Sequence, residues 1–226
     1  MLLSPLFTSS LLFLTSFVSA QPGYGETSKY CASSSTPSSS GGANVTGICY
    51  LQYYMSPTAP LFRIAIPSDA QSNTEFDTIL EIIAPLSLKW VGFAWGGGMT
   101  LNPLTVAWPN EHTVRGVVVT SRWATGRTLP KIYSATHTLL SQTRNATHWS
   151  VEIVCKGCSR WTGGSLNTAG SAQFAWALSR SAPQNPGSSS STFPIHNNVG
   201  MISEPLDFAK NSREVWSGWV NKPKTT

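Results

Sequence analysis

The stretch Trp149–Val154, WSVEIV, alternates apolar and polar side chains at almost every residue, and Leu61–Ile66, LFRIAI, shows a related period of two. Successive side chains of a strand point to opposite faces of a sheet, so this alternation is typical of strands with one buried face. Similar short runs recur, and Gly, Pro, Asn and Ser fill the gaps between them. The pattern predicts an all-β fold, an antiparallel β-sandwich of immunoglobulin-like type, rather than a helical bundle or a parallel α/β sheet. The expected strands are residues 50–54, 61–66, 76–83, 89–95, 104–108, 114–120, 137–142, 148–155 and 173–179, with a short terminal helix within Leu206–Val220.

The composition indicates one exported domain. The chain has 226 residues, of which 41% are hydrophobic, enough to bury one core. Only 11% are charged, against roughly 25% in an ordinary soluble domain, which argues against a cytosolic helical enzyme. Fifteen basic and ten acidic residues give a net charge of +5, but the cations are scattered. We therefore expect no nucleic-acid partner, although an acidic protein partner is compatible with the charge, and we expect a monomer.

The first 20 residues have the character of a secretory signal peptide. Residues 1–20 carry no charged side chain, are mostly apolar and end in the small-residue sequence Val18-Ser19-Ala20. The mature domain is then expected to cover residues 21–226 and to be extracellular. No later apolar run approaches the length of a membrane helix, so we expect no membrane anchor.

Four cysteines in an exported chain are expected to be oxidised, and three pairings are possible. Sequence order favours Cys31 with Cys49, which closes a Ser-rich loop over 31–49, and Cys155 with Cys158 in CKGC. The second pair lacks the following His of a c-type haem site, the second cysteine pair of a zinc site and the βαβ setting of a thioredoxin. A structural disulfide is the favoured interpretation.

Two sequons, Asn44-Val45-Thr46 and Asn145-Ala146-Thr147, are acceptor sites for N-glycosylation. If they are used, both segments lie at the surface, and we expect a glycoprotein.

Several enzyme classes leave no motif in this sequence. It contains no G-x-S-x-G elbow, no H-E-x-x-H zinc motif and no Walker loop, and its glycine clusters do not complete a dinucleotide fingerprint. A copper monooxygenase that attacks polysaccharides needs an N-terminal His, whereas Gln21 is expected there. A glycoside hydrolase remains open, because two of the ten acids could form an unmarked catalytic pair.

Two segments carry side chains with a recognisable shared chemistry. Within 89–108 an apolar run leads into three glycines and then Met99, and within 191–200 His196 follows a Pro on a late loop. A thioether and an imidazole form one of the known axial pairs for haem iron. Taken alone, a Met beside glycines more often packs in a core, and a loop His is more often solvated.

A family resemblance strengthens this pair. The segments WVGFAWGGGMT, SRWATG, NATHWSVEIVCKGCSRW, AQFAWALS and STFPIH, in this order, resemble the haem-binding cytochrome domain of fungal cellobiose dehydrogenases, a branch of the DOMON-like domains. The resemblance covers about residues 50–200. It implies a DOMON-type sandwich with a pocket for one haem b, ligated by Met99 and His196, so that 21–226 is a b-type cytochrome domain. It also implies the disulfide between Cys155 and Cys158.

Further haem contacts are less specific. Arg122 and Arg127 are candidates to pair with haem propionates, and Arg127 stands where the family is expected to have an aromatic residue. Six aromatic residues, of which we expect only one or two to contact haem, are Trp90, Phe93, Trp95, Trp108, Trp123 and Phe193; Trp95 and Phe193 are the preferred ones. His112, His137, His148 and Met55 suit surface or sheet positions better than ligation. Met201 is the only substitute for Met99, but its closeness to His196 in sequence argues against it.

With both axial positions filled, the resemblance implies electron transfer rather than catalysis. The expected acceptor is a lytic polysaccharide monooxygenase in cellulose or hemicellulose degradation, and the donor a separate flavoenzyme or a small reductant, because no flavin domain follows in this chain. We expect a free-standing cytochrome, or one cut from a longer precursor. The alternatives are a haem-free DOMON-type module that binds carbohydrate through exposed tryptophans, and a glycoside hydrolase.

Overall fold

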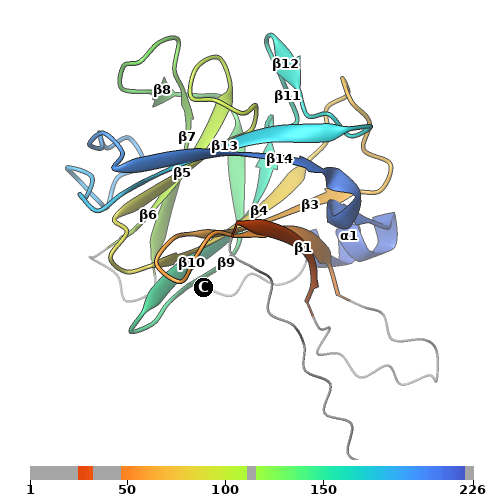
Figure 1. Cartoon of the computed structure of the whole chain (residues 1–226), viewed down its shortest axis with the longest axis horizontal. Helices are drawn as coiled ribbons and strands as arrows, with labels where there is room; N and C mark the ends of the chain where they lie inside the picture. The colour runs from red at the N-terminus through yellow and green to blue at the C-terminus, as the bar shows by residue number, and fades with distance from the viewer. Residues whose placement is uncertain (1–24, 33–46, 111–115, 222–226) are drawn as a thin grey trace, which may run out of the picture.

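The computed structural model describes residues 25–32, 47–110 and 116–221, which form two antiparallel sheets packed face to face (Figure 1). The seven-stranded sheet has the order β1 (Glu26–Cys31), β2 (Cys49–Tyr54), β3 (Leu61–Pro67), β4 (Thr78–Pro85), β10 (His148–Lys156) and β9 (Thr136–Arg144), with β15 (Lys210–Asn211) parallel to β3. The six-stranded sheet has the order β14 (Asn198–Pro205), β13 (Ser171–Ser179), β5 (Trp90–Ala94), β6 (Pro103–Pro109), β7 (Val117–Trp123) and β8 (Lys131–Ile132). A small hairpin pairs β11 (Arg160–Trp161) with β12 (Gly164–Ser165).

The predicted sandwich and all nine predicted strands are confirmed, with ends that differ by a few residues. Two longer strands, β1 and β14, were not predicted. The sequence of β1, ETSKYC, has no buried residue, and β14 is mostly exposed, so neither shows the apolar alternation that marks a half-buried strand.

The terminal segment differs from the single helix expected within Leu206–Val220. A 3₁₀ turn, η1 (Leu206–Ala209), leads into β15, and the α-helix α1 covers only Arg213–Val220. Asn211 explains the interruption, because its Oδ1 accepts from the Cys49 amide at 2.7 Å and its Nδ2 donates to the Cys49 carbonyl at 2.8 Å. These bonds hold the chain extended beside the sheet, and the Ser212 side chain then caps α1.

The core lies between the sheets and is rich in aromatic rings. Phe93 of β5 packs on Phe62 of the opposite sheet with ring centroids 5.2 Å apart, and it also contacts Phe174 and Trp95. All four rings are at most 1% exposed. Burying a Phe side chain contributes roughly 2 kcal/mol, so this cluster fixes the two sheets on each other.

Both predicted disulfides are present. Cys31–Cys49 joins directly paired residues of β1 and β2, and Cys155–Cys158 closes the turn after β10, where Gly157 has a φ of +86°. The helix α1 packs Trp216 against the outer side of the seven-stranded sheet, where it contacts residues such as Tyr50 and Ile79. Neither helix of the described residues has the length and apolar character needed to cross a bilayer.

Candidate functional site

A second hydrophobic cluster lies on the outer face of the six-stranded sheet, away from the other sheet. Its buried members are Trp90, Ala94, Leu104, Val106 and Trp108, and Met99 and Phe193 pack against them. Residues of β5 alternate, so that Trp90, Gly92 and Ala94 face outward while Val91 and Phe93 face the core. A soluble sheet normally shows polar residues on such a face, so this apolar outer cluster indicates a binding surface.

The middle of this face consists of four small residues, which we call the small-residue strip: Gly92, Ala94, Ala175 and Ala177. The register pairs Gly92 with Ala177 and Ala94 with Ala175, so the strip spans two rungs of the β5–β13 ladder. A Cβ built on Gly92 would lie 3.4 Å from the Trp90 ring and 3.9 Å from the Ala177 methyl group. The strip therefore leaves room that a side chain would fill, between the bulky residues of β6 and the exposed Val199 and Met201 of β14.

The loop between β5 and β6 carries Met99 to one end of the strip. Gly97 has a φ of +80°, and a Cβ there would approach the Gln173 Cβ to 2.9 Å, so the loop needs glycine to pass close to the start of β13. Asn102 donates from Nδ2 to the carbonyls of Gly98 and Thr100 at 3.1 and 3.0 Å. These bonds on both sides of Met99 fix the loop, and Met99 is partly buried against the outer cluster.

His196 lies at the other end of the strip, on the loop from β13 to β14. The next residue, Asn197, donates its amide to the carbonyl of Leu178 at 2.8 Å, which ties this part of the loop to the end of β13. Phe193 lies between Trp90 and Trp108, with ring centroids 5.0 and 6.2 Å away. The His196 side chain is exposed and makes no hydrogen bond to any described residue.

Met99 and His196 thus belong to loops at opposite ends of β13, one near Gln173 and the other near Leu178. The outer face of β5 between them, from Ala94 to Trp90, extends about 13 Å at roughly 3.3 Å per strand residue. The loops that carry the two donors predicted from the sequence therefore lie at two ends of one apolar surface.

The other predicted contacts separate into two groups. Phe193, Trp90 and Trp108 belong to the outer cluster. The preferred Trp95 does not, because the alternation of β5 turns it into the core, where it is 0% exposed and donates from Nε1 to the Thr105 hydroxyl. Phe93 is also in the core, and Trp123 stacks on Tyr133 at the end of the sandwich.

The two arginines have different surroundings. Arg127 is exposed in the connection from β7 to β8 and makes no bond to any described residue. Arg122, by contrast, is 3% exposed on the outer face of β7, and its guanidinium donates to backbone carbonyls of neighbouring loops. Most donors of Arg122 therefore already have partners within the chain, and a propionate contact of either arginine stays a prediction.

The rival ligands can also be placed. Met201 is 65% exposed on the outer side of β14, paired with Ala175, so the strand carries it toward the Met99 end of the strip despite its closeness to His196 in sequence. Met55 packs against the core, and His148 bonds with the Thr147 hydroxyl.

His112 lies outside the described residues, as do Asn44 and the predicted signal peptide. Asn145 lies in an exposed turn between β9 and β10, where the sequon is accessible.

His137 lies beside Cys155 and Cys158, and the three potential ligand atoms are within 4.8 Å of one another. Both sulfurs are bonded to each other, so they do not offer thiolates to a metal. The imidazole Nε2 is 3.2 Å from the Thr105 hydroxyl, and burial lowers the His137 pKa to about 4. His137 is therefore a neutral residue at the edge of the core.

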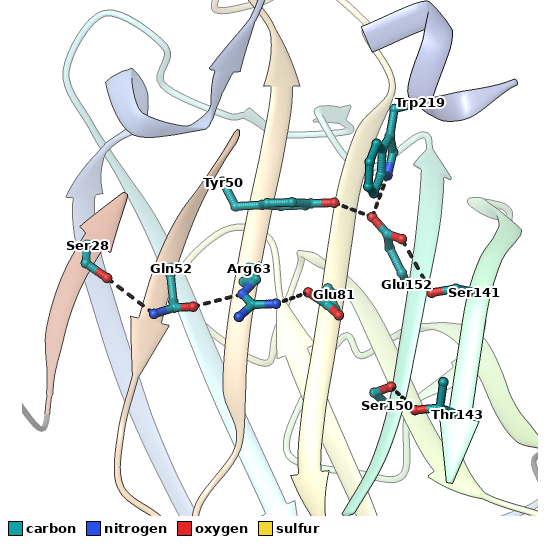
Figure 2. Close-up of polar contacts among 10 residues, drawn as sticks. All are labelled: Ser28, Tyr50, Gln52, Arg63, Glu81, Ser141, Thr143, Ser150, Glu152 and Trp219. Atoms are coloured by element: carbon teal, nitrogen blue, oxygen red, sulfur yellow. Dashed lines mark hydrogen bonds and ion pairs between the residues drawn. The ribbon is translucent and has the colours of Figure 1, made fainter. Parts of the chain in front are cut away.

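Two carboxylates that could suit a glycoside hydrolase, Glu81 and Glu152, are directly paired across β4 and β10 (Figure 2). Glu81 accepts from Arg63 at 2.8 Å, and its pKa is raised by burial, against the lowering effect of Arg63. Glu152 accepts from the Tyr50 hydroxyl and from Trp219 Nε1 of α1, and it is 6% exposed. Each carboxylate is thus engaged in a polar contact, Glu81 with Arg63 and Glu152 with Tyr50 and with Trp219 of α1.

An open groove of about 800 Å³ lies at the end of the sandwich beyond Met99. It is bordered by the stacked pair Trp123 and Tyr133, whose centroids are 4.9 Å apart, and by the exposed Leu101. Three threonines and Lys131 supply its polar groups.

Sequence reasoning missed the small-residue strip and the partners of Arg122. A signal for the strip was present, because W-x-G-x-A at 90–94 and A-x-A at 175–177 place small residues on one face of two strands. The Arg122 contacts had no signal, since they join residues far apart in the chain.

Comparisons with known proteins identify the family of this chain. The family described as the cytochrome domain of cellobiose dehydrogenase matches residues 43–213. A pyrroloquinoline quinone-dependent pyranose dehydrogenase from Coprinopsis cinerea is 33% identical over 174 residues, which are 75% of this chain and 24% of that protein. The chain thus spans about a quarter of the length of this curated relative.

Two solved structures are similar over most of the chain. The cytochrome b domain of pyranose dehydrogenase from Coprinopsis cinerea has a TM-score of 0.70 at 27% identity and covers 81% of this chain and 96% of that one. The cytochrome domain of Myriococcum thermophilum cellobiose dehydrogenase has a TM-score of 0.69 at 28% identity, with 79% and 92% covered.

Proposed function

Because the chain belongs to the family of cytochrome domains of cellobiose dehydrogenase, we propose that it binds one haem b between Met99 and His196 and transfers single electrons outside the cell. Family membership implies haem binding and electron transfer. The haem type, the two ligands, the partners and the location are our proposal.

The residues of the outer face fit a haem group. The strip of Gly92, Ala94, Ala175 and Ala177 leaves an apolar surface without large side chains, and a thioether and an imidazole approach it from opposite ends. The Trp90 Nε1 atom is buried there without a hydrogen-bond partner among the described residues. An apolar surface with unused donors is what a bound group would complete.

The protein's own residues would perform three tasks. When bound, haem supplies a one-electron iron couple, which this chain's side chains do not provide. Met99 and His196 would supply the thioether and the imidazole that hold the iron. Trp90, Trp108 and Phe193 exclude water from the surface beside them. Asn102 and Asn197 restrain the two loops, so the donors need little rearrangement.

The partners follow from the relatives. A sugar dehydrogenase, carrying either a quinone or a flavin, is the proposed electron donor, because the relatives are named as pyranose and cellobiose dehydrogenases. A lytic polysaccharide monooxygenase is the proposed acceptor, and small reductants are further donors. The apolar residues 1–20 and the accessible Asn145 sequon support a secreted glycoprotein.

The observation that carries the proposal is the presence of Met99 and His196 at two ends of one small-residue strip. We expect the purified protein, after reduction with dithionite, to show sharp α and β bands of low-spin haem. Met99→Ala should convert the spectrum to high spin, and His196→Ala should lose most of the haem, because imidazole binds more strongly than a thioether. Unchanged low-spin spectra in both variants would contradict the ligand assignment. Stopped-flow mixing of the reduced protein with a lytic polysaccharide monooxygenase then tests the acceptor.

Carbohydrate binding is the second candidate, and the groove beside Trp123 and Tyr133 favours it. Aromatic faces and hydroxyl groups suit a neutral sugar chain. A colourless protein that binds cellulose, and loses this binding on Trp123→Ala, would replace the cytochrome proposal.

A further inference from the structure

Arg122 is a buried cation whose bonds go to neutral oxygens. Its side chain lies on the outer face of β7, where Arg122 is paired with Leu104 of β6, and it is 3% exposed. Its Nε donates to the Thr120 hydroxyl at 3.1 Å and its Nη1 to the Pro130 carbonyl at 3.4 Å. Its Nη2 donates to the carbonyls of Ser189 and Ser191, both at 2.7 Å. We call Arg122 and these four oxygens the Arg122 clamp.

The clamp contains no counter-charge. Within the part of the chain that the structure describes, no carboxylate lies within ion-pair distance of Arg122. Taking an arginine out of water without a partner charge is costly, and this desolvation lowers its pKa. A buried cation without a counter-charge contributes neither to surface solubility nor to an ion pair. Its contacts indicate what it does: it joins β7, the β7–β8 connection and the β13–β14 loop.

The loop that Arg122 holds is the one that carries His196. Ser191 precedes His196 by five residues, and between them Phe193 lies with its ring centroid 5.3 Å from the guanidinium carbon. Phe193 in turn rests on Trp90. The Ser-rich sequence before it has no apolar side chain to fix its own position. The carbonyl bonds from Arg122, the Phe193 ring and the bond from Trp108 Nε1 to the Pro186 carbonyl at 2.9 Å together set where the loop crosses the sheet, and the Asn197 amide ties its end to β13.

We propose that Arg122 is the positioning residue that holds the His196 loop over the small-residue strip, and that its buried positive charge favours the reduced state of the site. This inference rests on the proposed haem function. Four of the five N–H groups of the guanidinium are engaged, so Arg122 acts through the loop. Lysine cannot replace it, because a single ammonium group lacks the planar fork that reaches three segments.

The test compares three variants of the full-length protein with a matched control. Arg122→Met removes both the planar guanidinium and its charge, whereas Arg122→Lys removes the guanidinium but keeps a positive charge. Thr120→Val removes one acceptor of Arg122, and valine keeps the shape of the threonine side chain. Arg160→Met is the control, because it removes a positive charge from the β11–β12 hairpin, where the side chain is exposed and has no partner among the described residues. Hydrogen exchange of the amides in 184–197 measures the loop, and the rate of haem transfer to excess apomyoglobin measures haem retention.

Arg122→Met should raise both rates by about tenfold or more, since hydrogen bonds to a charged group stabilise by about 1.5–3 kcal/mol. Arg122→Lys should also loosen the loop, and Thr120→Val should have a smaller effect of the same sign, whereas Arg160→Met should behave as wild type. The reduction potential should shift negative in Arg122→Met and less in Arg122→Lys. If Arg122 had only a structural role, the reduction potential would shift equally in Arg122→Met and Arg122→Lys.

Wild-type rates of amide exchange and haem transfer in Arg122→Met would overturn the inference, as would equal effects in Arg160→Met. If Arg122→Met does not fold, Thr120→Val becomes the test. Wild-type hydrogen exchange of the loop amides in that variant would contradict the clamp. A wild-type protein without haem contradicts the proposed function, but the exchange rates of the loop still test the clamp. A haem-bound wild type with unaffected Arg122 variants contradicts the clamp alone.

Discussion

Acidification should destabilise this protein through one buried histidine, His137. It lies on β9, paired with Cys155 of β10, and its Nε2 is 3.2 Å from the Thr105 hydroxyl of the opposite sheet. That hydroxyl already accepts from Trp95 Nε1 at 3.0 Å, so the three side chains form a polar bridge between the sheets. Burial disfavours the charged imidazole and lowers its pKa from 6.5 to about 4.

The sign and size of the effect follow from proton binding. Between pH 6.5 and about 4 the unfolded chain binds a proton at His137 that the folded protein does not, so stability falls as the pH falls through this window. At 1.36 kcal/mol per pKa unit, the difference between the two values corresponds to about 3 kcal/mol. For a domain of this size, that is a decrease in Tm of about 10 °C.

The assay is chemical unfolding at closely spaced pH values from 7 to 3.5, with His137→Gln as the comparison. Glutamine keeps a polar atom near Thr105 but does not titrate. As the pH falls, the unfolding free energy of the wild type should therefore decrease by about 3 kcal/mol relative to that of the variant. Carboxylates contribute equally to both proteins and cancel in this difference. His148→Gln, on the adjacent strand, serves as the control. Parallel stability curves for wild type and His137→Gln would refute the argument.

Two further predictions concern the outer face. Met201→Ala should leave the low-spin spectrum intact, and the double variant Met99→Ala, Met201→Ala should resemble Met99→Ala; low-spin haem that disappears only in the double variant would identify Met201 as the ligand instead. Gly92→Leu should cover the small-residue strip and lower haem content about tenfold or more, while Gly92→Ala, whose Cβ meets only ordinary contacts, should retain it. Equal haem content in Gly92→Leu, measured as pyridine haemochrome, would exclude the strip as the haem surface.

The inner strands could be predicted from the sequence because burial imposes a pattern on them. In Trp149–Val154 one face packs in the core and the other carries Ser150 and Glu152, so the period of two is visible in the residues themselves. The edge strand β14 packs on a neighbour along one side only, and its composition is set by the outer face and the loop rather than by the core. Such a strand has no pattern that a single sequence reveals.

The candidate site was predicted through its chemistry rather than its geometry. Met99 and His196 were identified from residue type and from the resemblance, but which face each aromatic residue occupies depends on the register of β5. Trp95 was one of the preferred aromatic candidates for the pocket, but it lies in the core, because one step along a strand reverses the direction of a side chain. The partners of Arg122 are backbone carbonyls 67 and 69 residues away, and no residue type marks a carbonyl.

The position of the candidate site outside the core has a consequence for stability. Phe62, Phe93 and Phe174 hold the two sheets together without any residue of the small-residue strip, and both disulfides also lie elsewhere. Gly92, Ala94, Ala175 and Ala177 contribute little buried apolar area themselves, so the sheet does not depend on the group that covers them. Ligand binding and folding are therefore separable in this architecture. Substitutions on the outer face can tune the site while the sandwich persists, whereas the loops of Met99 and His196, held by Asn102 and by the Arg122 clamp, determine how well the two donors are aligned.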